Sequence, residues 1–194
     1  MKTSIKIFFL VIATLTLSAT TSFAQFKAGS GLISASGAYT IFSVEDTDAT
    51  IDGGGFQIGY ESSISQGNFA FGGGLGYLVG SEDIDNGQIR YSTLPFWLYG
   101  KFLFGPEKAK FFVPLALGYQ ISERQISGEV FTIQDTYYNW DSGISLGTGI
   151  GINYYFSEKI CGIFSYNLQF LNNRYFKEGL AHVFNFGLGF QIGQ

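Results

Sequence analysis

Two residues of opposite charge, Glu61 and Lys101, have the spacing of a buried ion pair. Each stands three residues before the end of a segment in which bulky apolar residues alternate with small or polar ones, 54–64 and 89–104. Side chains on a strand point to opposite faces in turn, so both charges share the face of small and polar residues. One other segment separates the two, which allows the pair to meet across a narrow interior at one depth.

The neighbours of this pair define its expected role. An unpaired charge in a protein interior costs about 3–5 kcal/mol, so we expect polar side chains from Gln57, Ser63 or Tyr99 to hold the pair. These residues would form a hydrogen-bonded plug with a structural role. A gate for permeating solutes is the alternative.

Acidic residues gather in two polar connections that contain no Lys or Arg. Their members are Glu45, Asp46, Asp48 and Asp52 in the first connection and Glu82, Asp83 and Asp85 in the second. Asp46 and Asp48 begin like a calcium loop, but the next ligand and the required glycine are absent. We therefore expect a solvated surface and no cofactor. A weak divalent-cation site using Asp46, Asp48, Asp83 or Asp85, and a protein contact, remain alternatives.

Two glycine runs and a single cysteine complete the candidate residues. The runs 72–76 and 147–151 alternate glycine with apolar residues and lack the strand-to-helix transition of a nucleotide loop. Glycines that face inward and relieve crowding explain them better. Cys161 has no partner cysteine, so we expect a buried, inert thiol.

Eight alternating segments must position these residues, and they account for nearly the whole chain after residue 30. They span about 30–41, 54–64, 69–80, 89–104, 111–122, 140–156, 160–170 and 180–193. Connections after the second, fourth and sixth segments are short, and the others are longer and polar. This pattern predicts an all-β fold, a transmembrane antiparallel up-and-down eight-stranded β-barrel whose bulky apolar residues face lipid. Pro95 and Pro114 fall inside segments, where we expect a bulge or a local kink.

Residues 1–24 have the features of a cleavable export signal. Lys2 and Lys6 precede an apolar stretch, and Ser22-Phe23-Ala24 resembles a cleavage site. The expected mature domain, 25–194, keeps nine basic and 15 acidic residues, a net charge of −6. The sequence has no basic patch that could neutralise phosphates, so we do not expect a nucleic-acid partner.

The signal, the alternating segments, the rhythm of short and long connections and the aromatic-rich segment Phe184–Phe190 resemble the small eight-stranded outer-membrane barrel proteins, OmpX-like or OmpA-barrel-like. The resemblance implies location in the outer membrane of a Gram-negative bacterium, with both termini periplasmic. It also implies contact with outer-membrane lipids and lipopolysaccharide, and recognition of the C-terminal strand by the outer-membrane assembly machinery. We expect a monomer.

For function, the leading hypothesis is a non-enzymatic protein that contributes to envelope integrity and to surface interaction through its extracellular loops. A narrow porin-like channel, or a conduit for small or apolar solutes, is the alternative. A lipid-modifying enzyme is disfavoured because Val183-Phe184 follows His182, the only histidine, where such a site would need a serine. A soluble lipocalin-type binder would need an apolar interior, which the glycine- and serine-rich face does not supply.

Overall fold

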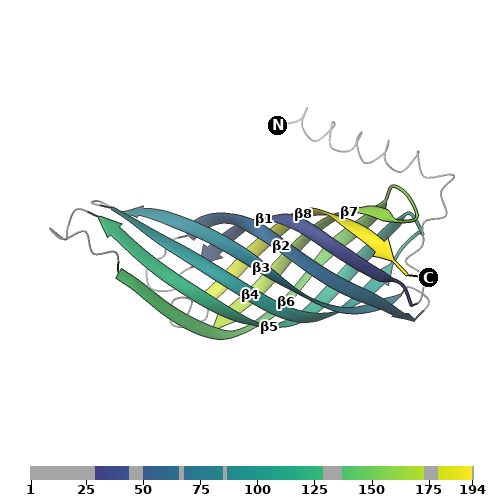
Figure 1. Cartoon of the computed structure of the whole chain (residues 1–194), viewed down its shortest axis with the longest axis horizontal. Coiled ribbons are helices and arrows are strands. Elements are labelled where there is room, and N and C mark those ends of the chain that lie inside the picture. Colours follow the sequence, from purple (N-terminus) through teal and green to yellow (C-terminus); the bar gives the residue numbers. More distant parts are fainter. Residues whose placement is uncertain are drawn as a thin grey trace, which may run out of the picture.

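The chain folds into one closed antiparallel barrel in which each strand pairs with the next in sequence and β8 pairs with β1 (Figure 1). This computed structural model describes residues 29–43, 50–65, 68–84, 87–128, 137–172 and 179–193. The strands are β1 (Gly31–Ser43), β2 (Thr50–Ser65), β3 (Phe69–Ile84), β4 (Gly87–Phe104), β5 (Ala109–Gly128), β6 (Tyr137–Tyr155), β7 (Ile160–Asn172) and β8 (Gly179–Ile192). The eight-stranded up-and-down barrel predicted from the sequence is confirmed.

The two ends of the barrel differ. The connections β2–β3, β4–β5 and β6–β7 are short, and we call their side of the barrel the turn end. Gly31, the first residue of β1, pairs with Ile192, the last residue of β8. The start of β1 and the end of β8 therefore also lie at the turn end. We call the opposite side the loop end.

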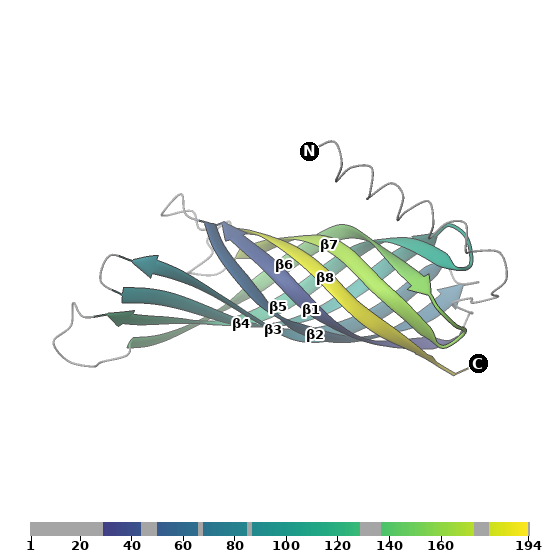
Figure 2. The ribbon, with the colours of Figure 1, turned by 90° about the horizontal axis from the view of Figure 1, so that it is seen from above.

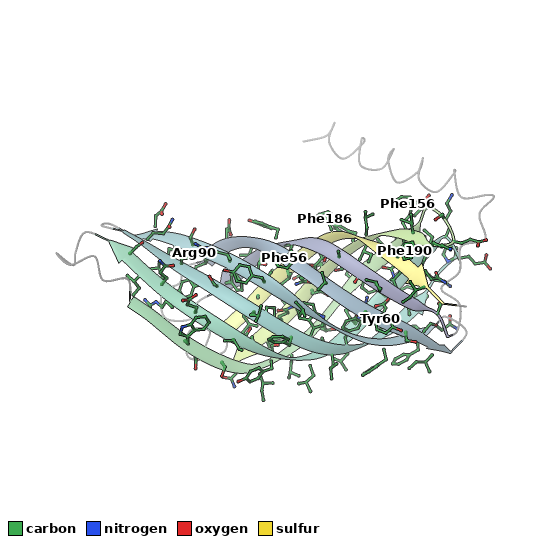
Figure 3. The ribbon with its side chains drawn as sticks, viewed as in Figure 1. Phe56, Tyr60, Arg90, Phe156, Phe186 and Phe190 are labelled. Carbon is green, nitrogen blue, oxygen red and sulfur yellow. The ribbon has the colours of Figure 1, made fainter. Side chains whose placement is uncertain are left out.

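The bulky apolar side chains face outward, as the alternation predicts. Phe56, Tyr60, Phe186 and Phe190 point away from the barrel wall in Figure 3, and each is about half exposed, from 48% to 60%. Their sequence neighbours Gln57, Glu61, Gly187 and Gly189 occupy the inner face. The outside is therefore a hydrocarbon belt. In the described part of the chain, no helix is long and apolar enough to cross a membrane.

The strands run further at the loop end than the sequence predicts, and β3, β4, β5 and β6 project beyond the others (Figure 2). The apolar alternation stops near Gly80 and Ser122, yet β3 continues to Ile84 and β5 to Gly128. Asp52, Glu82 and Asp83, expected in loops, therefore lie on strands. The reason is that ladder hydrogen bonds continue beyond the apolar belt, where outward side chains no longer need to be hydrophobic.

We call this extension the projecting sheet: residues 81–84 of β3, 87–90 of β4, 125–128 of β5 and 137–143 of β6. Most of its exposed side chains are polar, including Ser81, Asp83, Gln88 and Arg90, and Trp140 of β6 is exposed among them. Figure 3 shows Arg90 on this part of the wall. The β6 part has no β7 residue paired with it among the described residues, because β6–β7 pairing begins at Ile144.

The sequence predicts a bulge or a local kink at Pro95 and Pro114. No bulge occurs at either proline, and each instead lies beside a local interruption of one ladder. The β3–β4 ladder is interrupted between Leu75↔Phe96 and Leu78↔Thr93, but the register is the same on both sides of the gap. The β5–β6 ladder has a similar unshifted gap beside Pro114. Each proline removes a donor toward one neighbour only. The β4–β5 ladder runs through both prolines without a break and keeps the register.

Candidate functional site

The barrel lumen holds the predicted ion pair. Lys101 Nζ lies 2.5 Å from Glu61 Oε2, and the Tyr99 hydroxyl donates a hydrogen bond of 3.1 Å to the same oxygen. The Glu61 side chain is 2% exposed and that of Lys101 13%. A cation and a hydroxyl both satisfy Oε2, which offsets much of the cost of burying this carboxylate. The other oxygen, Oε1, is buried and has no hydrogen-bond partner among the described residues.

Aromatic rings complete the surroundings of the ammonium group. Lys101 Nζ lies 4.8 Å from the centre of the Tyr99 ring and 4.4 Å from that of Phe112. Both distances are within the range of a cation–π interaction. Phe112 was not predicted as part of the site, since its role depends on β5 lying next to β4 with Lys101 opposite Pro114.

Gly72 is a second site residue that sequence reasoning did not assign to the pair. On β3 it lies opposite Glu61 of β2 on one side and opposite Tyr99 of β4 on the other. A Cβ atom on Gly72 would collide with the Tyr60 carbonyl oxygen and with Glu61 itself. The missing side chain lets Glu61 and Tyr99 meet across an intervening strand. The glycine run was visible in the sequence, but the register that gives Gly72 this position was not.

Gln57 and Ser63, the other predicted neighbours, do not bind the pair. Gln57 lines a central cavity of about 110 Å³, whose wall also includes Tyr99 and Lys101. Ser63 is buried, and its hydroxyl has no hydrogen-bond partner among the described residues. Small and polar side chains dominate the rest of the cavity wall, including Ser34, Ser36, Ser145, Asn167 and Asn185.

An apolar cluster narrows the lumen on each side of this cavity. At the loop end, the outer cluster consists of Ala38, Phe42, Ile51, Leu78, Tyr91, Leu171, Ala181 and Val183. At the turn end, the inner cluster consists of Leu32, Ala70, Leu103, Phe112, Tyr155 and Cys161. An eight-stranded barrel is just wide enough to be filled by side chains. The lumen is thus layered: apolar, polar, ion pair, apolar.

Charged side chains surround Tyr91, which belongs to the part of the outer cluster nearest the projecting sheet. Burial raises the pKa of the Tyr91 hydroxyl, an effect that Arg124 opposes and Glu82 reinforces. The Arg124 guanidinium lies 5.9 Å from the Tyr91 ring centre.

The other candidate residues do not gather into a second site. Asp46, Asp48 and Asp85 lie outside the described residues. Asp83 is exposed and accepts a hydrogen bond of 3.1 Å from Gln88 Nε2. No group of three metal-ligating side chains occurs in the described ranges. Cys161 is buried in the inner cluster.

His182 faces outward near the loop end. Its Nδ1 lies 2.8 Å from the Tyr166 hydroxyl, and the two rings are stacked with centres 6.0 Å apart. The imidazole therefore belongs to the aromatic outer surface rather than to the lumen.

The apolar belt, the closed ladder and the layered interior define a transmembrane barrel of the smallest common size. Comparison with known families agrees. The chain belongs to the outer membrane protein beta-barrel domain family, which matches residues 7–191. No curated protein matches the chain.

Several solved structures share the fold at low sequence identity. Ail, the attachment invasion locus protein of Yersinia pestis, has a TM-score of 0.60 at 12% identity, covering 85% of this chain and 99% of that one. Neisserial surface protein A has a TM-score of 0.56 at 11% identity, covering 84% and 98%. A major outer membrane protein from Thermus thermophilus gives 0.54 at 9%, covering 84% and 99%. These similarities establish the architecture, and this chain is an outer-membrane barrel protein.

Proposed function

We propose that this protein is a non-enzymatic component of the outer membrane that contributes to envelope integrity and interacts with partners at the cell surface. The observation that carries the proposal is the closed lumen. Phe42, Ile51 and Leu78 obstruct it at the loop end, and Leu32 and Leu103 obstruct it at the turn end, each 2% exposed or less. An interior sealed by hydrocarbon at both ends suits a rigid support better than a path for solutes.

The surface role rests on the projecting sheet and the loops that it carries. Its polar outward residues lie beyond the hydrocarbon belt, and its β6 part has an unpaired edge among the described residues. Unpaired strand edges and polar loops are common sites of protein recognition. Ail is named an attachment invasion locus protein, and attachment agrees with the proposed class of role.

The orientation and partners follow from the same proposal. Short turns face the periplasm in barrels of this kind, so the turn end, with the ends of β1 and β8, would be periplasmic after removal of residues 1–24. The belt would contact outer-membrane lipids and lipopolysaccharide, and β8 would be the strand recognised during assembly. The barrel has no open sheet edge within the belt, which is consistent with a monomer.

Catalysis receives no support from the geometry around the single histidine. His182 lies on the outer surface, and Phe184 and Tyr39 extend the aromatic contacts of its partner Tyr166. The lumen places the ion pair between the polar cavity and the inner cluster, and the Glu61 side chain is 2% exposed. These features favour a structural rather than a lipid-modifying role.

Electrical recording distinguishes the support from the channel. We expect the purified protein, inserted into planar bilayers, to give no discrete current steps, because both apolar clusters exclude hydrated ions. Insertion must be verified separately, for example by protease protection of the barrel in the same lipids. Reproducible unitary steps from verified, pure protein would overturn the closed lumen and favour the narrow channel.

A cellular measurement tests the envelope role. A strain that lacks the protein should take up more of a dye normally excluded by the outer membrane, and re-expression of the native chain should restore exclusion. Unchanged dye uptake, in medium that stresses the envelope with detergent, would contradict a contribution to integrity.

A further inference from the structure

The outer surface of the barrel is not uniformly convex. A groove of about 600 Å³ crosses β3 to β6 within the apolar belt. Outward side chains form its sides: Leu75, Phe96, Leu98, Leu117, Tyr119 and Ile144. Gly73, Gly74, Trp97 and Gly118 complete the lining. Since Gly74, Trp97 and Gly118 belong to the inward-facing set, they reach an external groove through their backbone.

The sequence explains why the wall is hollow here. Gly73 is an outward position on β3, between the bulky neighbours Phe71 and Leu75. A Cβ atom at Gly73 would lie 3.0 Å from the Trp97 carbonyl oxygen and from Leu98 Cδ2. The missing side chain leaves backbone as the floor of the groove.

The inner side of the same wall is equally thin. Cβ atoms on Gly74 and Gly76 would lie 3.0 and 3.2 Å from the Trp97 ring. The indole therefore lies against the inner face of β3, directly behind the groove. Trp97 also lines the central cavity. Only the thickness of a glycine backbone separates this ring from the lipid side.

We propose that this groove is a binding site for one acyl chain of a surrounding membrane lipid. The groove lies inside the hydrocarbon belt, and none of its lining residues is charged, so it suits a lipid tail rather than a headgroup. Four neighbouring strands span about 14 Å across the wall, a length that a flexible hydrocarbon tail can follow. An unfilled groove would lose the dispersion contacts that a tail restores. A flat protein surface would bridge the sides without reaching the backbone floor.

Trp97 provides the readout, because the chain contains only two tryptophans, Trp97 and Trp140. The test uses the full barrel carrying Trp140→Phe, reconstituted in phosphatidylcholine vesicles with or without bromine on the acyl chains. Bromine quenches an indole at close range. We expect brominated chains to cause a clear loss of Trp97 emission.

Two leucine substitutions separate the groove from the belt as a whole. In the Trp140→Phe protein, Gly73→Leu fills the groove and should restore most of the emission. Gly37→Leu is the matched control: Gly37 is also an outward glycine, but its added Cβ would be 4.0 Å from the nearest atom, the Phe186 carbonyl oxygen. This control should leave the quenching unchanged. Circular dichroism verifies that both variants keep the β-barrel spectrum.

A third variant covers the case in which Gly73→Leu does not fold. Leu75→Ala widens the groove and should deepen the loss of emission. Equal quenching in the Gly73→Leu and parent proteins, or equal recovery in the Gly37→Leu control, would overturn the acyl-chain site. Quenching that decreases as protein density in the vesicle rises would assign the groove to a second copy of the chain and would also overturn it. Neither result depends on whether the lumen conducts.

Discussion

Replacing Glu61 with alanine should lower the free energy of unfolding of the barrel by about 3–5 kcal/mol, because it leaves the Lys101 ammonium buried without its counter-charge. The substitution also removes the acceptor of the Tyr99 hydroxyl. The Tyr99 and Phe112 rings contact the ammonium but cannot replace a carboxylate. Equilibrium unfolding in denaturant, with the protein in lipid vesicles, measures the loss.

Two further variants show that the loss belongs to the pair. Glu61→Gln combined with Lys101→Met removes both charges and should recover most of the stability, since burying two neutral side chains is far less costly than burying one charge. Glu158→Ala removes an exposed carboxylate in the β6–β7 turn and should change stability by less than about 0.5 kcal/mol. If the double variant were as unstable as Glu61→Ala, the two charges would not be coupled.

The second large effect is expected at Gly72. Gly72→Ala should destabilise the barrel by at least about 3 kcal/mol, the upper part of the range for overpacking. The new methyl group meets the Tyr60 carbonyl oxygen and the Cβ and Cα atoms of Glu61, and backbone atoms cannot rotate away as a side-chain end can. Relief requires β2 and β3 to separate, which would also lengthen the Tyr99–Glu61 hydrogen bond. The same unfolding measurement applies.

Gly37→Ala is the control for this substitution. Gly37 lies on β1 with open space around a new Cβ, so we expect a change within about 0.5 kcal/mol. A similar effect at both glycines would mean that strand propensity, rather than the close approach at the ion pair, determines the cost. A stable Gly72→Ala barrel would show that β2 and β3 adjust without loss.

The sequence was sufficient to predict which way most side chains face. A strand in the belt must place hydrocarbon outward at every second residue, so Phe184, Phe186 and Phe190 reveal their face without any structure. The equal depth of Glu61 and Lys101 could be predicted in the same way, because each lies three residues from the end of its predicted segment at the turn end. The structure places them together in the lumen.

The parts that could not be predicted depend on relations between strands. Gly72 belongs to the site because of the register of β3 against both of its neighbours, and no local pattern encodes that register. Phe112 approaches Lys101 from another strand, so spacing within one segment says nothing about it. The projecting sheet was missed because apolar alternation ends where the belt ends, while backbone pairing continues.

Pro95 and Pro114 show a second reason why the sequence does not predict every detail of the ladders. The rule that proline breaks a ladder is correct at Pro95 and Pro114, but a broken ladder does not require an extra residue. The unbroken pairing of β4 with β5 holds both strands in register, so the lost hydrogen bonds leave a gap and no shift. At the second gap the Thr148 hydroxyl donates a hydrogen bond of 3.0 Å to the Pro114 carbonyl oxygen.

The two ladder gaps beside Pro95 and Pro114 also affect how the barrel wall can deform. Hairpin β4–β5 is a continuous panel, and each of its long sides joins the rest of the cylinder through a seam with missing hydrogen bonds. A cylinder compressed sideways by its surroundings deforms where its wall is least cross-linked. The lost hydrogen bonds therefore lower the cost at which the bilayer can flatten or tilt this panel, and the thin floor beside Trp97 adjoins one of its seams.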